Sequence, residues 1–192
     1  MSEGEHRRLF VALLVPEHVR VLGQAAAAPA REVAPELTWT RPEGWHLTLA
    51  FLGPVAVDRV PAVEETVGGA VAAAGVGPIG CRLGVPGRFG GRALWLGVED
   101  DPAGAIAALG EAVQAALEAA PGLPVQRQPV RPHLTLARAS RRGARITEAV
   151  TAAVAPVTAS WEADEVALVR SHLGGGPARY AEVASWPLTG AS

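Results

Sequence analysis

The pentapeptide His-Leu-Thr-Leu-Ala occurs twice in this chain, at 46–50 and at 133–137. In an extended strand the side chains alternate between two faces, so His46 and Thr48 share one face, as do His133 and Thr135. The leucines of each copy point to the opposite face and enter a core. Two such strands facing each other would place two imidazoles and two hydroxyls around one small anionic group. This constellation predicts an enzyme.

Two imidazoles can divide one reaction between them, because this side chain titrates near neutrality. Across a phosphodiester, one histidine takes a proton from water while the other donates a proton to the leaving ribose oxygen. The hydroxyls of Thr48 and Thr135 can donate hydrogen bonds to the non-bridging oxygens, where charge develops. General acid and base catalysis contribute on the order of 10²–10⁴-fold each, which suffices for a strained cyclic phosphate. We therefore expect a bell-shaped pH dependence with both limbs near neutrality.

Neither pentapeptide has the surroundings of a metal site. Catalytic zinc usually takes three protein ligands, and no third histidine or carboxylate adjoins either copy. We expect no metal and no other cofactor. A single His-x-Thr on a strand is most often structural, but two of only five histidines fall in identical contexts here. The repetition favours the catalytic interpretation.

Arginine is the only cation besides histidine in this chain, which has no lysine. A run of arginines without any acidic residue lies between Glu118 and Glu148. It is interpreted either as a track for an RNA backbone or as a solvated loop. Strand parity places Arg131 on the face of His133 but Arg138 on the opposite face, so Arg138 reaches the phosphate only if the strand ends or twists there. The run consists of Arg127, Arg131, Arg138, Arg141, Arg142 and Arg145.

Aromatic residues flank the first pentapeptide. Trp45 and Phe51 could each stack on a base, as aromatic side chains do in single-strand recognition. Core packing is the better interpretation of both. Phe10 and Tyr180 are weaker candidates of the same kind.

Composition narrows the class of protein. A chain of 192 residues with 49% hydrophobic content can bury one ordinary core, or two small lobes that share one. Its net charge of -2 argues against a protein that coats nucleic acid through bulk electrostatics. The lone Cys81 excludes an internal disulfide and suits a reducing cytoplasm. No apolar stretch is long enough to span a membrane and no signal-peptide pattern starts the chain, so we expect a soluble, cytoplasmic protein.

The elements that would position the two histidines follow from the apolar patterns. Strands and helices are interspersed with hairpin-like pairs, which favours an α+β class over a parallel doubly wound sheet. The helix expected at 58–74 has Asp58 as its N-cap. The two pentapeptides lie about half a chain length apart, which indicates an ancient structural repeat. We predict strands at 9–15, 37–40, 45–52 (closed by Gly53 and Pro54), 79–85, 93–98, 133–138, 165–171 and 180–183, and helices at 17–30, 58–74, 101–119 and 146–153.

The chain resembles the LigT-like members of the 2H phosphoesterase superfamily, close to the bacterial RNA 2',3'-cyclic phosphodiesterases once described as 2'-5' RNA ligases. The paired motifs are specific for that superfamily, and the resemblance spans nearly the whole chain. The matching segments lie at 8–12, 45–53, 94–98, 131–138, 169–173, 180 and 186–188.

The resemblance implies one α+β domain over 1–192, with two pseudo-symmetric lobes whose antiparallel sheets line a central cleft and whose helices lie outside. It also implies hydrolysis of a 2',3'-cyclic phosphate to a 2'-phosphomonoester. The catalytic assignment carries over to His46 and His133, and the phosphate contacts to Thr48, Thr135 and Arg138. Arg131, Phe51, Trp45 and Tyr180 are further candidates for substrate contact.

Several alternatives stay open at this point. The substrate is the end of an RNA or a small molecule such as a cyclic nucleotide or ADP-ribose cyclic phosphate. A non-catalytic binder of RNA ends would keep the pocket, although it would not need two histidines. Ligation of 2'-5' ends is the reverse of the same chemistry. We expect a monomer that needs no membrane.

Overall fold

The computed structural model describes residues 5–139, 143–172 and 179–190. Its strands include the segments that apolar runs or apolar–polar alternation predict. The strands are β1 (His6–Leu14), β2 (Thr38–Trp39), β3 (His46–Ala56), β4 (Ile79–Phe89), β5 (Ala93–Asp101), β6 (His133–Arg138), β7 (Ser160–Ala163), β8 (Glu165–His172) and β9 (Arg179–Pro187). The helices are α1 (Glu17–Val33), α2 (Val60–Ala74), α3 (Ala105–Ala119) and α4 (Glu148–Ala152), with short 3-10 turns η1 (Pro42–Gly44) and η2 (Val57–Arg59).

The strands form two sheets. One has four strands in the order β3-β1-β8-β9, and the other has five in the order β2-β6-β5-β4-β7. All pairings between the named strands are antiparallel. β1 is buried on both faces from Leu9 to Leu13, because Leu9, Val11 and Leu13 pack in the main core while Phe10 and Ala12 pack in a second apolar cluster. The order β3-β1-β8-β9 recurs in the second sheet as β6-β5-β4-β7, so each pentapeptide strand has an equivalent place.

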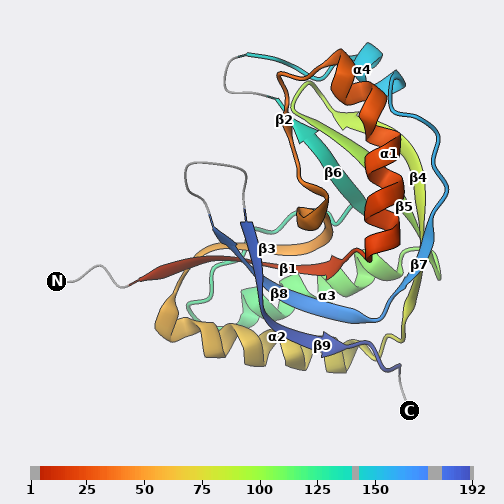
Figure 1. Cartoon of the computed structure of the whole chain (residues 1–192). Coiled ribbons are helices and arrows are strands. Elements are labelled where there is room, and N and C mark those ends of the chain that lie inside the picture. Colours follow the sequence, from red (N-terminus) through yellow and green to blue (C-terminus); the bar gives the residue numbers. More distant parts are fainter. Residues whose placement is uncertain (1–4, 140–142, 173–178, 191–192) are drawn as a thin grey trace.

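Each sheet carries its own helices (Figure 1). α2 and α3 pack together under the four-stranded sheet, with α2 against β9 and α3 against β3. α1 runs along the five-stranded sheet, where His18 Nε2 lies 3.1 Å from the carbonyl oxygen of Ser160 in β7. The N–H of Ala155, just after α4, donates to the carbonyl of Ala26 in α1 at 2.9 Å. β3 and β6 contact each other between the two layers.

The structure corrects some of the expected element boundaries. β3 does not end at Gly53 and Pro54 but continues to Ala56. Gly53 adopts a φ of 74°, which glycine tolerates within the strand. Pro54 lies on an edge strand, where no neighbouring strand needs its missing N–H. Asp58 is not the N-cap of α2. It lies within η2, and the helix begins after Arg59, whose own dihedrals are already helical.

Other differences concern length. β4 extends to Phe89, further into the Gly-rich turn than expected. β5 begins at Ala93 as expected but runs on to Asp101, so α3 begins only at Ala105. The short strand β7 is absent from the sequence prediction, because its four residues are too few for the alternation to stand out. Within the described residues, no helix has the length and apolar character that a membrane span requires.

Candidate active site

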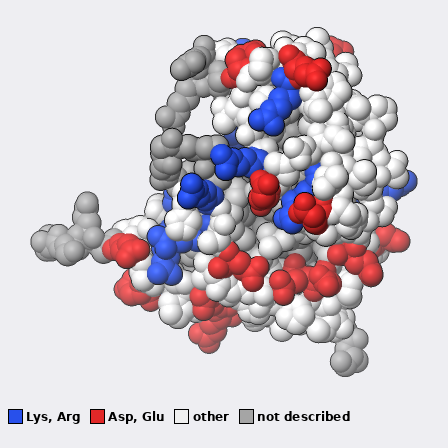
Figure 2. All heavy atoms as spheres, viewed as in Figure 1, with Lys and Arg blue, Asp and Glu red and all other residues white. Residues whose placement is uncertain are grey.

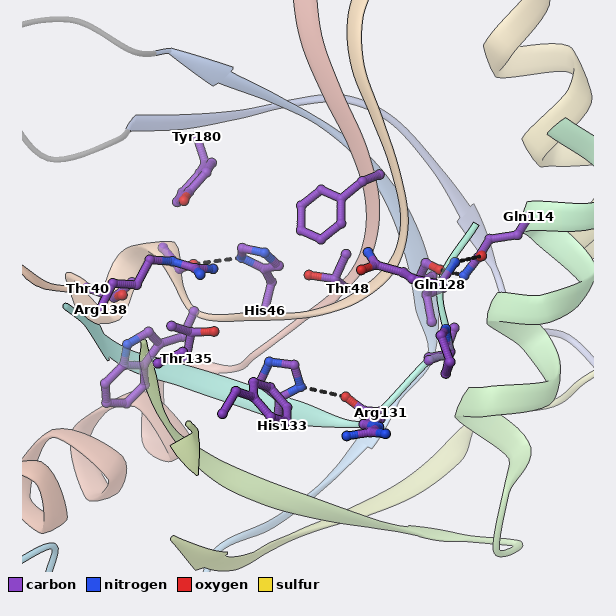
Figure 3. Close-up of a pocket in the computed structure, with 18 residues that line it drawn as sticks. Thr40, His46, Thr48, Gln114, Gln128, Arg131, His133, Thr135, Arg138 and Tyr180 are labelled. Atoms are coloured by element: carbon purple, nitrogen blue, oxygen red, sulfur yellow. Dashed lines mark hydrogen bonds between the residues drawn. The ribbon is translucent and has the colours of Figure 1, made fainter. Parts of the chain in front are cut away.

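The two pentapeptides line one cavity of about 390 Å³ between the sheets. His46 and Thr48 enter it from β3, and His133 and Thr135 enter it from β6. Figure 3 shows both threonine hydroxyls pointing into the space between the two imidazoles. Alternation along each strand accounts for this arrangement, since Leu47 and Leu134 are buried on the opposite faces.

A β-bulge lies at the same position in both pentapeptides. In β3, Val11 and Ala12 of β1 face Ala50 and Thr48, so Leu49 is the extra residue. In β6, Leu94 and Trp95 of β5 face Ala137 and Thr135, so Leu136 is the extra residue. An extra residue reverses the alternation beyond it.

The bulges correct the expectation from strand parity. Arg138 is five residues after His133, and Phe51 is five residues after His46. Uninterrupted strands would turn both side chains away, but both line the cavity. The bulge at Leu136 turns Arg138, the last residue of β6, toward the site, so the strand ends at Arg138 as expected, and the bulge adds a cause that strand parity did not foresee.

The carbonyl oxygen of each bulge residue accepts a hydrogen bond from a residue outside the named strands. The N–H of Thr40 donates to the oxygen of Leu136 at 2.9 Å. On the other strand, the side-chain amide of Gln114 donates to the oxygen of Leu49 at 2.8 Å, and its own oxygen accepts from the N–H of Gln128 at 3.0 Å. Gln114 is only 1% exposed. It ties α3 both to the bulge and to the segment that leads to His133.

Sequence reasoning missed several residues that line the cavity. Thr40, Phe89, Gln114 and Gln128 all border it. Gln114 had a usable signal, since it lies on the apolar stripe of α3 next to Val113. A polar side chain on a buried helix face needs a hydrogen-bond partner. Nothing in the sequence distinguishes the other three from ordinary loop or strand residues.

The two imidazoles are held in the same way. Nδ1 of His46 lies 2.7 Å from the carbonyl oxygen of Gly44, and Nδ1 of His133 lies 2.6 Å from that of Arg131. Each carbonyl belongs to the residue two positions earlier and accepts from a protonated Nδ1, which leaves Nε2 for proton transfer. Gly44 also lets Tyr180 pack closely, because a Cβ there would lie 2.7 Å from the tyrosine ring.

Burial lowers the pKa of both histidines. The pKa of His46 falls to about 4, mainly by desolvation, with Arg138 and His133 adding repulsion against the bond to Gly44. The pKa of His133 is lowered by desolvation and by the positive charges of Arg138 and Arg131. An aromatic ring packs against each imidazole. His46 packs against Phe10 at 4.5 Å between ring centroids, and His133 against Phe89 at 5.0 Å. Both shifts favour the neutral imidazole at pH 7 in the free protein.

Arginine dominates the charge around the cavity. Arg131 and Arg138 line it, and among the described residues no carboxylate does. Figure 2 shows arginine side chains gathered where the two layers meet, while acidic side chains are spread across the lower part of the same face. The uncompensated positive charge favours an anionic ligand.

The two other described arginines of the predicted run do not join them. Arg127 lies 3.7 Å from Glu118 of α3, and Arg145 packs over Gly91 in the turn between β4 and β5. Arg141 and Arg142 lie outside the described residues. Of the described members, only Arg131 and Arg138 reach the cavity.

The aromatic candidates have different surroundings. Trp45 borders the cavity but is only 4% exposed and belongs to the core, where its ring packs over Gly23 of α1. Phe51 and Tyr180 are half-buried, and both line the cavity. Trp45 is thus a wall of the site, while Phe51 and Tyr180 offer surface to a ligand. In the part of the chain that the structure describes, no three His, Cys, Asp or Glu side chains cluster as metal ligands would.

This geometry agrees with comparisons to known proteins. A family model described as the 2'-5' RNA ligase superfamily matches residues 37–175. The chain belongs to this superfamily. The resemblance recognised in the sequence is thereby confirmed, and the matched residues include both pentapeptides.

Individual members of the superfamily support the assignment. The chain is 28% identical over 188 residues to the RNA 2',3'-cyclic phosphodiesterase of Geobacillus stearothermophilus, and the match covers 95% of this chain and 57% of that protein. The chain thus spans little more than half the length of this relative.

Solved structures of the superfamily confirm the expected α+β fold with two antiparallel sheets. The protein TT0787 of Thermus thermophilus superimposes with a TM-score of 0.74 at 28% identity, covering 95% of this chain and 98% of that one. Escherichia coli LigT in its apo form gives a TM-score of 0.73 at 26% identity, covering 97% and 99%. LigT has also been crystallised with 3'-AMP.

Proposed function

We propose that this protein hydrolyses 2',3'-cyclic phosphates at RNA or nucleotide ends to 2'-phosphomonoesters. The observation that carries the proposal is the matched pair of imidazoles. His46 and His133 bond a backbone carbonyl through Nδ1 in the same way and line one cavity with two threonine hydroxyls and Arg138. Membership of the superfamily supports the same chemistry.

The reaction needs one proton acceptor and one proton donor. One imidazole accepts a proton from water through Nε2 as the water oxygen bonds to phosphorus. The P–O3' bond breaks, and the other imidazole, as imidazolium, donates its proton to O3'. Thr48, Thr135 and Arg138 donate to the phosphate oxygens, where negative charge builds up. The phosphate stays on O2', and a proton exchange with solvent restores the pair.

Substrate binding favours uptake of the missing proton from solvent. Burial and nearby arginines lower the pKa values of both imidazoles and favour their neutral form in the free protein at pH 7. A bound phosphodiester brings a negative charge between them, which favours the imidazolium form. The acid is therefore charged when substrate is present.

The proposal is tested by product analysis. The protein is incubated with a 2',3'-cyclic mononucleotide and with an oligonucleotide ending in the same group, both in EDTA, and the product isomer is identified. We expect the 2'-phosphate in both cases. His18→Ala serves as the matched control, because His18 bonds β7 away from the cavity. Binding without turnover would support a non-catalytic binder instead, and activity that returns only with added divalent metal would contradict the proposed mechanism.

A further inference from the structure

A second cavity of about 140 Å³ adjoins the one between the imidazoles. The two cavities share His46, Phe51, Arg138 and Tyr180 in their walls. A ligand in the first cavity can therefore continue into the second without leaving the protein surface. The residues that line only the second are Arg8, Leu9, Phe10, Gly53, Gln126 and Ser171.

The second cavity is built by neighbouring strands of the four-stranded sheet. Arg8 of β1 faces Ser171 of β8, and Ser171 faces Tyr180 of β9, so the three residues lie side by side across the sheet. Phe10, two residues after Arg8, shares the same face. This order comes from strand pairing and not from sequence proximity.

The edge strand closes the cavity on the other side. A second irregularity in β3 falls between the pairs Leu9–Gly53 and Phe10–Phe51. The carbonyl of Phe51 accepts from the N–H of Gln126 at 2.9 Å, which holds the connecting segment against the strand. Gln126 is exposed and lines the second cavity.

The lining combines aromatic surface with unopposed positive charge. Phe10 packs edge-on against Tyr180 at 5.4 Å and lies 6.2 Å from Phe51, so aromatic groups cluster at the junction of the cavities. Arg8 is exposed. Among the described residues, no acidic side chain lines the second cavity. Aromatic rings beside arginines are the combination that binds single-stranded nucleic acid, by stacking and by phosphate contacts.

We propose that the second cavity, which we call the Arg8 subsite, binds the nucleotide preceding the one that carries the cyclic phosphate. Arg8 contacts the phosphate that joins the two nucleotides, and the half-buried rings of Phe51 and Tyr180, packed against the buried Phe10, stack on the preceding base. The preferred substrate is then an RNA end of at least two nucleotides. This inference rests on the proposed function and gives its substrate class.

The test compares substrates that differ by one part at a time. These are a 2',3'-cyclic mononucleotide, the same compound with a 5'-phosphate, a dinucleotide with a 2',3'-cyclic end, and that dinucleotide without its first base. Stacking contributes about 1–3 kcal/mol per base, so we expect kcat/KM to be about tenfold or more higher for the dinucleotide than for the mononucleotide. The two partial substrates should fall between them.

Salt provides an independent readout of the phosphate contact. For single strands, log–log salt slopes change by about 0.7 for each phosphate neutralised. The slope of log kcat/KM against log salt concentration should be steeper for the dinucleotide than for the mononucleotide by about this amount. Arg8→Gln should remove the difference in slope and lower kcat/KM for the dinucleotide. Mononucleotide turnover does not involve Arg8, so unchanged turnover of the mononucleotide shows that the variant is folded. Arg82→Gln is the matched control, since Arg82 pairs with Glu99 at another surface.

Equal kcat/KM and equal salt slopes for mononucleotide and dinucleotide would overturn the subsite, as would an Arg8→Gln variant that lowers both alike. Loss of turnover with every substrate would contradict the proposed function instead. Binding of a mononucleotide and a dinucleotide ending in a 2'-phosphate, measured by calorimetry, would then test the subsite by itself: equal affinities would refute it.

Discussion

At the scale of single residues, the duplicated histidines act as one unit. Each imidazole has its own backbone carbonyl, and in the proposed mechanism neither completes the reaction alone. We expect His46→Ala and His133→Ala each to abolish turnover of a 2',3'-cyclic phosphate, and the double variant to be no slower than either single variant, because effects within a catalytic unit do not add. Steady-state kinetics with circular dichroism as the check on folding measures this. Substantial activity in either single variant would refute the acid–base pair.

The threonine hydroxyls should matter less than the imidazoles. They point between the rings and are placed to bond oxygens whose charge grows during the reaction. We expect Thr48→Ala and Thr135→Ala each to raise the barrier by roughly 2.7–4 kcal/mol, as the loss of an oxyanion donor does. The loss should appear in kcat. Rates within twofold of the wild type would mean that the hydroxyls do not contact the phosphate.

The lowered histidine pKa values predict a particular pH dependence. Since kcat/KM reports the free enzyme and kcat the substrate complex, the kcat/KM optimum should lie at lower pH than the kcat optimum. In the free protein, burial lowers the pKa of His46 to about 4 and also lowers that of His133, whereas bound phosphate raises both. Each apparent pKa belongs to the coupled pair. A kcat optimum at or below that of kcat/KM would contradict this.

At the scale of the elements, the bulges in β3 and β6 decide what faces the cavity, and Gln114 supports one of them. Replacing Gln114 with Leu keeps the side-chain size but leaves the Leu49 carbonyl and the Gln128 N–H without their partner. An unsatisfied buried polar group costs about 1–3 kcal/mol. We expect Gln114→Leu to lower the free energy of unfolding by that order and to reduce kcat, because the motif strand and the segment before His133 lose a shared anchor.

Chemical denaturation and kinetics together measure the effect. Gln24→Leu is the matched control, since Gln24 is exposed on α1 and should leave both quantities nearly unchanged. A Gln114→Leu variant as stable and as active as the wild type would show that the bulge does not depend on this anchor.

At the scale of the whole molecule, the position of each arginine in the fold determines its effect on substrate. Arg138 lines both cavities, whereas Arg127 pairs with Glu118. We expect Arg138→Gln to lower kcat/KM about 10–100-fold for mononucleotide and oligonucleotide alike, since a hydrogen bond to a charged group is worth about 1.5–3 kcal/mol. Arg127→Gln should change neither the rate nor the salt dependence. An equal loss in both variants would restore the continuous arginine track considered from the sequence.

The sequence by itself determined the superfamily and the two motifs on which the proposed chemistry rests. Alternation of side chains is a local property of extended backbone. The pairs His46 with Thr48 and His133 with Thr135 therefore each share one face of a strand, independently of the rest of the chain. The same holds for β6, whose predicted bounds match the structure, and for the mixture of strands and helices that indicated an α+β class.

Only the tertiary structure decided which other residues join the site. The bulges at Leu49 and Leu136 depend on pairing with β1 and β5, so strand parity placed Arg138 on the wrong face. Arg8 reaches the second cavity, and Gln114 the first, through contacts between segments far apart in sequence. Register and packing arise from these long-range contacts. A pattern of side chains along one segment carries no information about them.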